Sequence, residues 1–125
     1  MIATSLEYLD ALAGEPGRDP ALMLELASAY RSIANIQGEP REANRGNLAA
    51  SIGNFEKSAA LLQELERLKP GEIATQREQW RTSFALATAY YQVTDPRWRS
   101  EFRRAAGLAE RISATPGASI DDQLL

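Results

Sequence analysis

The stretches Leu26-Ala27-Ser28-Ala29-Tyr30 and Leu86-Ala87-Thr88-Ala89-Tyr90 decide the fold, because they repeat one five-residue pattern with a single Ser-to-Thr change. Each lies in a longer segment in which apolar residues recur every three or four positions, the spacing of one face of an α-helix. Repeated amphipathic helices are typical of helical arrays, in which each unit buries its apolar face by stacking on its neighbours. The sequence therefore predicts an array of stacked helices.

Glycine and proline divide the rest of the chain into further helical segments. The apolar periodicity predicts five helices, over about residues 5–13, 20–37, 48–69, 75–93 and 96–114. Two kinds of start signal recur, an Asp-Pro pair and a Thr followed three residues later by Glu: Asp19-Pro20 and Asp95-Pro96, then Thr4 with Glu7 and Thr75 with Glu78. Asn47 is the predicted N-cap of the third helix.

No segment alternates apolar and polar residues with a period of two, so a sheet is not expected and the predicted fold class is all-α. Residues 1–117 are predicted to form a single helical domain, and 118–125 a loose C-terminal tail. The polar segment 39–46 has no helical periodicity and is predicted to be a loop inserted between two paired helices. The sequence does not indicate what this insert does.

A family resemblance rests on the repeated pattern. Leu26-Ala27-x-x-Tyr30 and its copy resemble the Leu-Gly-x-x-Tyr core of the first helix of the tetratricopeptide repeat. The next helix is similar to the family's second helix in its small, aromatic and small residues: Ser51, Phe55 and Ser58. Segment 38–47 is similar to an extended turn in tetratricopeptide regions of bacterial serine/threonine protein kinases. The resemblance implies antiparallel helix pairs in a short right-handed solenoid of about five helices.

The same resemblance implies a binding groove, because the first helices of tetratricopeptide pairs line a concave face. The groove residues that it implies come from two helices: Leu24, Ser28, Arg31 and Ser32 from one, and Arg81, Phe84, Thr88, Tyr91 and Gln92 from the other. Arginines in such a groove can bind a carboxylate bidentately, and aromatic rings can hold an apolar side chain. The implied function is a non-catalytic scaffold that binds a peptide or a protein domain. The alternative is that these side chains are solvated or pack on the insert.

The chain contains no cysteine and no histidine, which excludes several classes of chemistry. Thiolate and imidazole metal sites, haem ligation through these residues, cysteine nucleophiles and Ser-His-Asp triads are all ruled out. Glu64 and Glu66 stand two positions apart, so a helix points them to different sides, and we interpret them as surface charge. We therefore expect no catalytic residue, no metal and no cofactor, and interpret the chain as not an enzyme.

The net charge of −3 and the lack of a strongly basic segment argue against nucleic acid as a partner. Arginines flank Trp98 and Phe102, but helical spacing places the two rings on a buried stripe and the arginines largely outside it, as on a solvated face. No apolar run approaches the roughly 18 residues of a membrane helix, so we expect no membrane insertion by this chain. The expected partner is a protein or a peptide.

Two other interpretations remain open. The resemblance to kinase-associated regions implies a sensor or regulatory segment of a larger bacterial serine/threonine kinase, whose exposed end helices favour a homodimer. A small all-α enzyme would have to use only Asp, Glu, Lys, Arg, Tyr, Ser or Thr, and is disfavoured. The sequence does not indicate the compartment. The cytoplasm is the default, and an extracytoplasmic place would follow from a membrane-anchored kinase.

Overall fold

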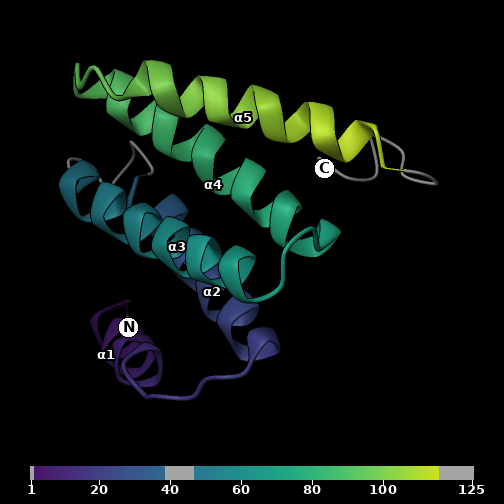
Figure 1. Ribbon diagram of the computed structural model, residues 1–125. Coiled ribbons are helices and arrows are strands. Elements are labelled where there is room, and N and C mark those ends of the chain that lie inside the picture. Colours follow the sequence, from purple (N-terminus) through teal and green to yellow (C-terminus); the bar gives the residue numbers. More distant parts are fainter. Residues whose placement is uncertain (1, 39–46, 116–125) are drawn as a thin grey trace.

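The computed structural model describes residues 2–38 and 47–115, and these residues form five α-helices (Figure 1). Successive helices pack against each other in antiparallel fashion, and no strand occurs in the described ranges, so the all-α prediction is confirmed. The predicted insert 39–46 and tail 118–125 lie outside the described residues. The helices are α1 (Ile2–Ala13), α2 (Pro20–Gln37), α3 (Leu48–Leu68), α4 (Ile73–Gln92) and α5 (Trp98–Ser113).

The start of α2 follows the local signal in the sequence. The Asp19 carboxylate accepts a hydrogen bond from the backbone N–H of Leu22 at 2.8 Å, and Pro20 occupies the first helical position. Asn47 is the N-cap of α3 as predicted, but its side chain makes no capping hydrogen bond. Helix α5 begins at Trp98, two residues later than predicted, because Asp95 accepts from the backbone N–H of Arg97 at 2.9 Å and holds a turn ahead of the helix.

Both predicted capping boxes are wrong. Helix α1 begins at Ile2, so Thr4 lies within its first turn and cannot act as the N-cap. Helix α4 begins at Ile73 after Glu72, and Thr75 is a buried residue of the first turn with 2% exposure. The Glu78 side chain, which the box required at the helix start, pairs with arginines instead. Packing of the first turn therefore outweighs the local capping signal at this position.

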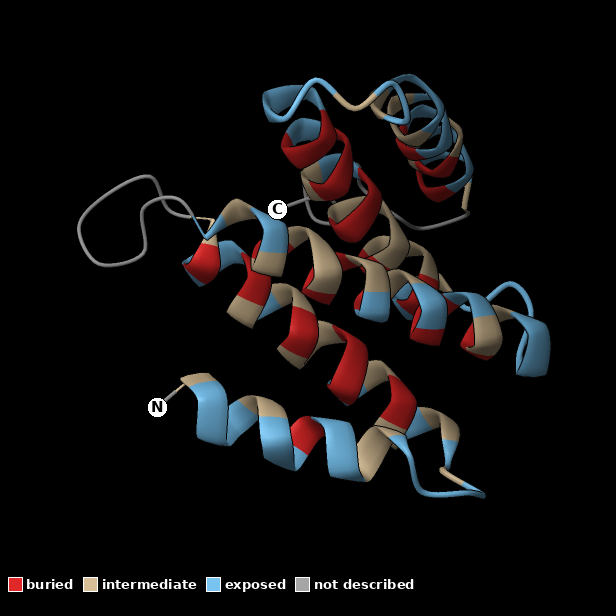
Figure 2. Cartoon of the chain, turned by 90° about the vertical axis from the view of Figure 1, so that its left-hand side faces the viewer, coloured by how far each residue is buried: buried red, intermediate tan, exposed pale blue. Residues whose placement is uncertain are grey.

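The helices are arranged as two long pairs with a shorter helix at one end. Helix α2 pairs with α3, and α4 pairs with α5, while α3 and α2 both also contact α4. Helix α1 lies along α2 at the lower end in Figure 1. Buried residues face the spaces between neighbouring helices, and the outer faces of α1 and α5 are largely exposed (Figure 2). Every described helix thus has at least one neighbour packed along it.

Apolar side chains form two clusters between these layers. The first lies among α1, α2 and α3, and the second among α2, α3 and α4. Each fully buried leucine contributes about 1.5–3 kcal/mol relative to an exposed one. The buried members are Leu9, Leu26, Ala27, Tyr30, Leu61 and Leu62 in the first cluster, and Ala34, Phe55, Leu86 and Tyr90 in the second.

Small residues allow α2 and α3 to approach closely. Ala27 and Ala34 on α2 and Ser51 and Ser58 on α3 are all 0% exposed. The Ser58 hydroxyl donates to the carbonyl of Ala27 at 2.8 Å, and the Ser51 hydroxyl donates to the carbonyl of Ala34 at 2.6 Å. Burial of these hydroxyls is tolerated because each has an acceptor. The small residues at 51 and 58 therefore form the points of close approach in the contact between α2 and α3.

Tyr30 and Tyr90, the residues that end the repeated pattern, have equivalent surroundings. Both rings are buried, with 1% and 3% exposure. The Tyr30 hydroxyl donates to Asp10 on α1, the helix before its own, and the Tyr90 hydroxyl donates to Glu56 on α3 at 2.6 Å, again the preceding helix. A buried tyrosine hydroxyl requires such a partner.

A cation completes each of these two contacts. Lys57 lies 5.5 Å from the centre of the Tyr30 ring and pairs with Asp10 at 3.1 Å. The Arg97 guanidinium lies 4.4 Å from the centre of the Tyr90 ring, and it pairs with Glu56 at 3.5 Å. Both cations come from the segment that follows the tyrosine helix in its own pair. The two pairs therefore repeat one arrangement of tyrosine, carboxylate and cation.

Candidate functional site

Helices α2 and α4 carry all nine predicted groove residues. A hollow of about 290 Å³ lies between the two helices toward the start of α4. Of the nine predicted residues, Leu24, Ser28 and Arg81 line it. The other lining residues are Glu25, Ala74, Arg77 and Glu78.

An ion cluster crosses from α2 to α4 beside this hollow. Arg31 donates from Nε to Glu78 at 2.9 Å and from Nη2 at 3.3 Å, and Arg81 donates from Nη1 to the same carboxylate at 3.1 Å. The Glu78 side chain is 12% exposed, against 19% for Arg31 and 25% for Arg81. Two of the predicted groove arginines are thus brought together by a carboxylate that the sequence had placed in a capping box.

Arg77 belongs to the same hollow, although it was not among the predicted residues. It stands one helical turn before Arg81, and its Nε atom is buried with no hydrogen-bond acceptor among the described residues. Extending the α4 stripe back from residues 84 and 81 by four positions would have found it. Among the described residues of the hollow and the ion cluster beside it, Arg31, Arg77 and Arg81 outnumber the acidic Glu25 and Glu78, so this part of the face carries a positive surplus.

A second hollow, of about 260 Å³, lies at the other end of α4. Phe84, Thr88 and Gln92 line it from α4, together with residues near the end of α2 and the start of α3. Phe84 is 48% exposed, so one side of its ring is open to solvent. Three further predicted residues are therefore brought together, but in a hollow separate from the one that holds the arginines.

Tyr91 and Ser32 line neither of these hollows. Tyr91 is 62% exposed and packs edge-on against Trp98 of α5, with the ring centres 5.4 Å apart. Phe84 packs edge-on against Phe102 at 5.7 Å, so aromatic contacts join α4 to α5 along this side. Ser32 is an exposed residue of α2. The predicted set is therefore divided among the basic hollow with the ion cluster beside it, the aromatic hollow and the α4–α5 contact, and Ser32 belongs to none of them.

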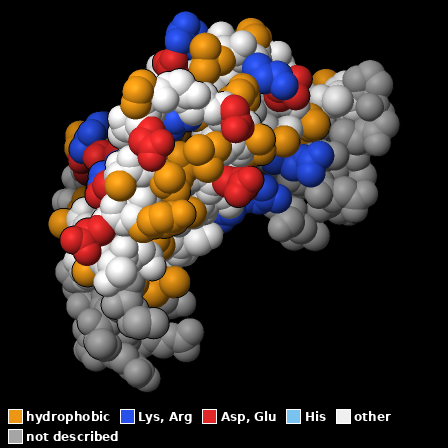
Figure 3. All heavy atoms as spheres, turned by 90° about the horizontal axis from the view of Figure 1, so that it is seen from below, with side chains coloured by type: hydrophobic (Ala, Val, Ile, Leu, Met, Phe, Trp, Pro, Cys, Tyr) orange, Lys and Arg blue, Asp and Glu red, His pale blue; other side chains and the backbone are white. Residues whose placement is uncertain are grey.

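The face over α1 differs in character from the α2–α4 face. Helix α1 carries Glu7 and Asp10 and no basic residue. In the space-filling view from below, hydrophobic side chains form a band across the face, with acidic and basic side chains around it (Figure 3). An anionic ligand would be attracted by the arginines of the α2–α4 face.

The described residues limit the chemistry of these surfaces. Within residues 2–38 and 47–115, no group of three or more acidic side chains is placed to hold a metal ion. None of the helices in those ranges has both the length and the apolar character needed to cross a bilayer. What the α2–α4 face offers is a set of guanidinium donors beside apolar and hydroxyl side chains.

No family model, curated protein or solved structure matches the chain.

Proposed function

We propose that the protein is a non-catalytic interaction scaffold of the tetratricopeptide type. In this proposal the α2–α3 and α4–α5 pairs are successive units of a short right-handed solenoid, and α1 is the second helix of a preceding unit. Support comes from the matching surroundings of Tyr30 and Tyr90, each bonded to a carboxylate of the preceding helix. Contact between α2 and α4, the first helices of the two pairs, also agrees with such stacking.

The proposed ligand is an acidic peptide segment bound along the α2–α4 face. One observation carries this assignment: Arg31, Arg77 and Arg81 converge there against two glutamates, on a chain whose net charge is −3. Guanidinium groups bind carboxylates through paired N–H donors. A local positive surface on an acidic protein selects for an anionic partner and speeds its association.

Glu78 supports this role by ordering the arginines before a ligand arrives. Its carboxylate uses two N–H groups of Arg31 and one of Arg81, and each guanidinium carries five N–H donors. Donors therefore remain for a peptide carboxylate, on side chains that are already fixed in place. Ordering them in advance reduces the entropy lost on binding. The nearby apolar contact of Leu24 adds a place for an aliphatic side chain.

Selection from a random peptide library on the intact chain tests the proposal. We expect the enriched peptides to be acidic, and their affinity to fall as the salt concentration rises. Arg77→Ala should weaken binding by about tenfold or more, which is typical of a central contact. This variant is preferred to changes at Arg31 or Arg81, because Arg77 makes no contact with Glu78 in the cluster.

Arg103→Ala is the matched control, since Arg103 is an exposed arginine on α5. Its affinity for the enriched peptides should equal that of the unchanged chain. Selection that enriches no peptide, or peptides that bind equally well to the Arg77→Ala variant, would remove the assignment of ligand and face.

A further inference from the structure

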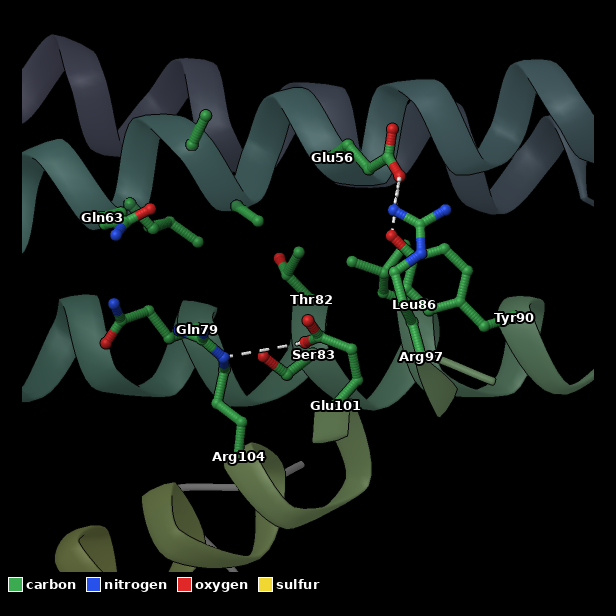
Figure 4. A pocket seen from close by; sticks show the side chains of 13 residues that line it. Glu56, Gln63, Gln79, Thr82, Ser83, Leu86, Tyr90, Arg97, Glu101 and Arg104 are labelled. Atoms are coloured by element: carbon green, nitrogen blue, oxygen red, sulfur yellow. Dashed lines mark hydrogen bonds and ion pairs between the residues drawn. The ribbon is translucent and has the colours of Figure 1, made fainter. Parts of the chain in front are cut away.

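A third hollow lies on the other side of α4, away from the proposed peptide face. Its volume is about 300 Å³, and it separates α3 from α5 with α4 as its floor (Figure 4). At about 100° per residue, the α4 residues at 79, 82, 83 and 86 fall opposite those at 77, 81, 84 and 88. The lining residues are Glu56, Ala59, Ala60, Leu62, Gln63, Gln79, Thr82, Ser83, Leu86, Tyr90, Arg97, Glu101 and Arg104.

The floor and one end of this α3–α5 hollow are fixed by contacts within the protein. Thr82 is 1% exposed and shares a hydrogen bond of 3.1 Å with Ser58, and Ser83 beside it is 4% exposed. One end is closed by the ion pair of Glu56 with Arg97, at 3.5 Å. A hollow with a rigid floor and a closed end can hold a small molecule in one orientation.

Helix α5 contributes two opposite charges to the wall. Glu101 and Arg104 stand three positions apart, and their nearest charged atoms are 3.8 Å from each other. The two groups form an ion pair, as the dashed line in Figure 4 marks, but 3.8 Å exceeds a hydrogen bond, so the hydrogen-bonding positions of both groups remain for a ligand. The Glu101 side chain is only 19% exposed, against 56% for Arg104. The wall therefore offers a carboxylate that can bind a cationic group directly beside a guanidinium that can bind an anionic group.

The remaining polar lining suits a ligand with several hydrogen-bonding groups. Gln63 of α3 and Gln79 of α4 lie at the same end of the hollow in Figure 4. Their amides both donate and accept hydrogen bonds. Ala59 and Ala60 supply an apolar wall between the polar ends. Glu56 and Glu101 balance Arg97 and Arg104, so the lining as a whole favours a ligand without net charge.

We propose that this hollow binds a free α-amino acid in its zwitterionic form. The ammonium group of the ligand binds Glu101, its carboxylate binds Arg104, and its side chain lies along Ala59 and Ala60. An α-amino acid carries opposite charges on neighbouring positions, which matches the neighbouring opposite charges of α5. The volume corresponds to about ten water molecules at ~30 Å³ each, enough for an amino acid of modest size.

Titration of the intact chain with each of the twenty free amino acids tests this proposal. Amide resonances recorded by NMR report both affinity and place. We expect at least one amino acid to give saturable shifts at millimolar concentration or below, centred on Ala59, Ala60 and Ser83. The N-acetylated and carboxamide derivatives of that amino acid should fail to bind, because each lacks one of the two charges.

Variants on α5 assign the charges. Glu101→Gln and Arg104→Gln should each weaken binding by about tenfold, the factor that corresponds to ~1.4 kcal/mol. Arg103→Gln, at an exposed position of the same helix, is the matched control and should bind as the unchanged chain does. Arg77→Ala should also leave this binding unchanged, so failure of the peptide proposal would not affect it.

Any one of three results would overturn the proposal. The first is the absence of saturable shifts with all twenty amino acids. The second is equally tight binding of the N-acetylated and carboxamide derivatives, and the third is equally tight binding of the free amino acid to both Gln variants. Circular dichroism of each variant, with helical content equal to that of the unchanged chain, separates loss of binding from loss of folding.

Discussion

Arg31 on α2 and Glu78 on α4 stand 47 positions apart in the sequence and share two hydrogen bonds, of 2.9 and 3.3 Å. Arg81 donates to the same carboxylate at 3.1 Å. The two helices belong to different pairs, so this cluster links one pair to the next. It therefore contributes, beside the α3–α4 contact, to how the pairs lie against each other, and it orders the basic part of the proposed binding face.

Glu78→Ala should lower the stability of the fold. The change leaves two mostly buried guanidinium groups without their shared carboxylate, and we expect the free energy of unfolding to fall by about 2–4 kcal/mol. Urea unfolding followed by circular dichroism measures this change. Glu64→Ala is the matched control, because Glu64 pairs with Arg67 on the surface and its loss should leave the transition unchanged. Equal losses in both variants would contradict the role given to the cluster.

Asp19→Ala should remove the N-cap of α2. The Asp19 carboxylate accepts from the backbone N–H of Leu22 at 2.8 Å, and loss of such a cap costs about 1 kcal/mol. Asn47→Ala serves as the comparison, because the Asn47 side chain makes no capping hydrogen bond at the start of α3. Thermal unfolding should show a lower midpoint for the first variant and not for the second. Two equal midpoints would mean that the cap at Asp19 adds nothing to stability.

These two helix starts show which features the sequence can predict. Asp19-Pro20 was predicted correctly because both signals act within one helical turn, and within the described part of the chain no distant group bonds to the Asp19 carboxylate. The capping box at Thr75 was wrong because Arg31, far away in the sequence, binds the glutamate that the box required. A single sequence does not reveal which distant side chain will bind a capping residue, so local signals fail to predict a helix start where tertiary contacts compete for that residue.

At the candidate site, too, some features could be predicted from the sequence and others could not. The family resemblance implied Arg31 and Arg81 as groove residues of two helices, and in the structure both pair with Glu78; extending the same α4 stripe by helical periodicity would also have included Arg77. Periodicity could not show that both arginines share Glu78. The α3–α5 hollow was missed altogether, because it depends on how far two non-consecutive helices diverge. That separation is set by the packing of α4 between them, which no local pattern encodes.

Tyr30→Phe should destabilise the protein at neutral pH and have less effect in acid. The hydrogen bond from Tyr30, followed by the contact with Lys57, holds the pKa of Asp10 below its usual range, although burial opposes this shift. A lowered pKa contributes stability above the unfolded value of about 3.9, and this contribution is lost as the pH falls through the folded value.

We therefore expect a loss of about 1–2 kcal/mol at neutral pH, which shrinks as the pH falls below the unfolded value of about 3.9 toward the lowered folded value. Denaturant unfolding over this pH range gives the comparison. Tyr8→Phe is the control, since Tyr8 is 66% exposed and its change should have no effect at either end of the range. A difference that does not depend on pH would exclude the Tyr30–Asp10 contact as its source.

Raising the pH should also lower the stability of the fold, in this case through the two equivalent tyrosines. Burial raises the pKa of Tyr30 and of Tyr90 well above the usual value, and the hydrogen bonds to Asp10 and Glu56 raise it further, because a tyrosinate would face a carboxylate. A raised pKa contributes stability that is fully present below the unfolded value of about 10 and is lost as the pH rises toward the folded value.

The free energy of unfolding should therefore fall steeply above pH ~10, and Tyr90→Phe should reduce that slope. Tyrosinate absorbance and helical circular dichroism, recorded in one titration, measure both events. Ionisation of both buried tyrosines while the helical signal stays intact would show that their hydroxyls are not held as described.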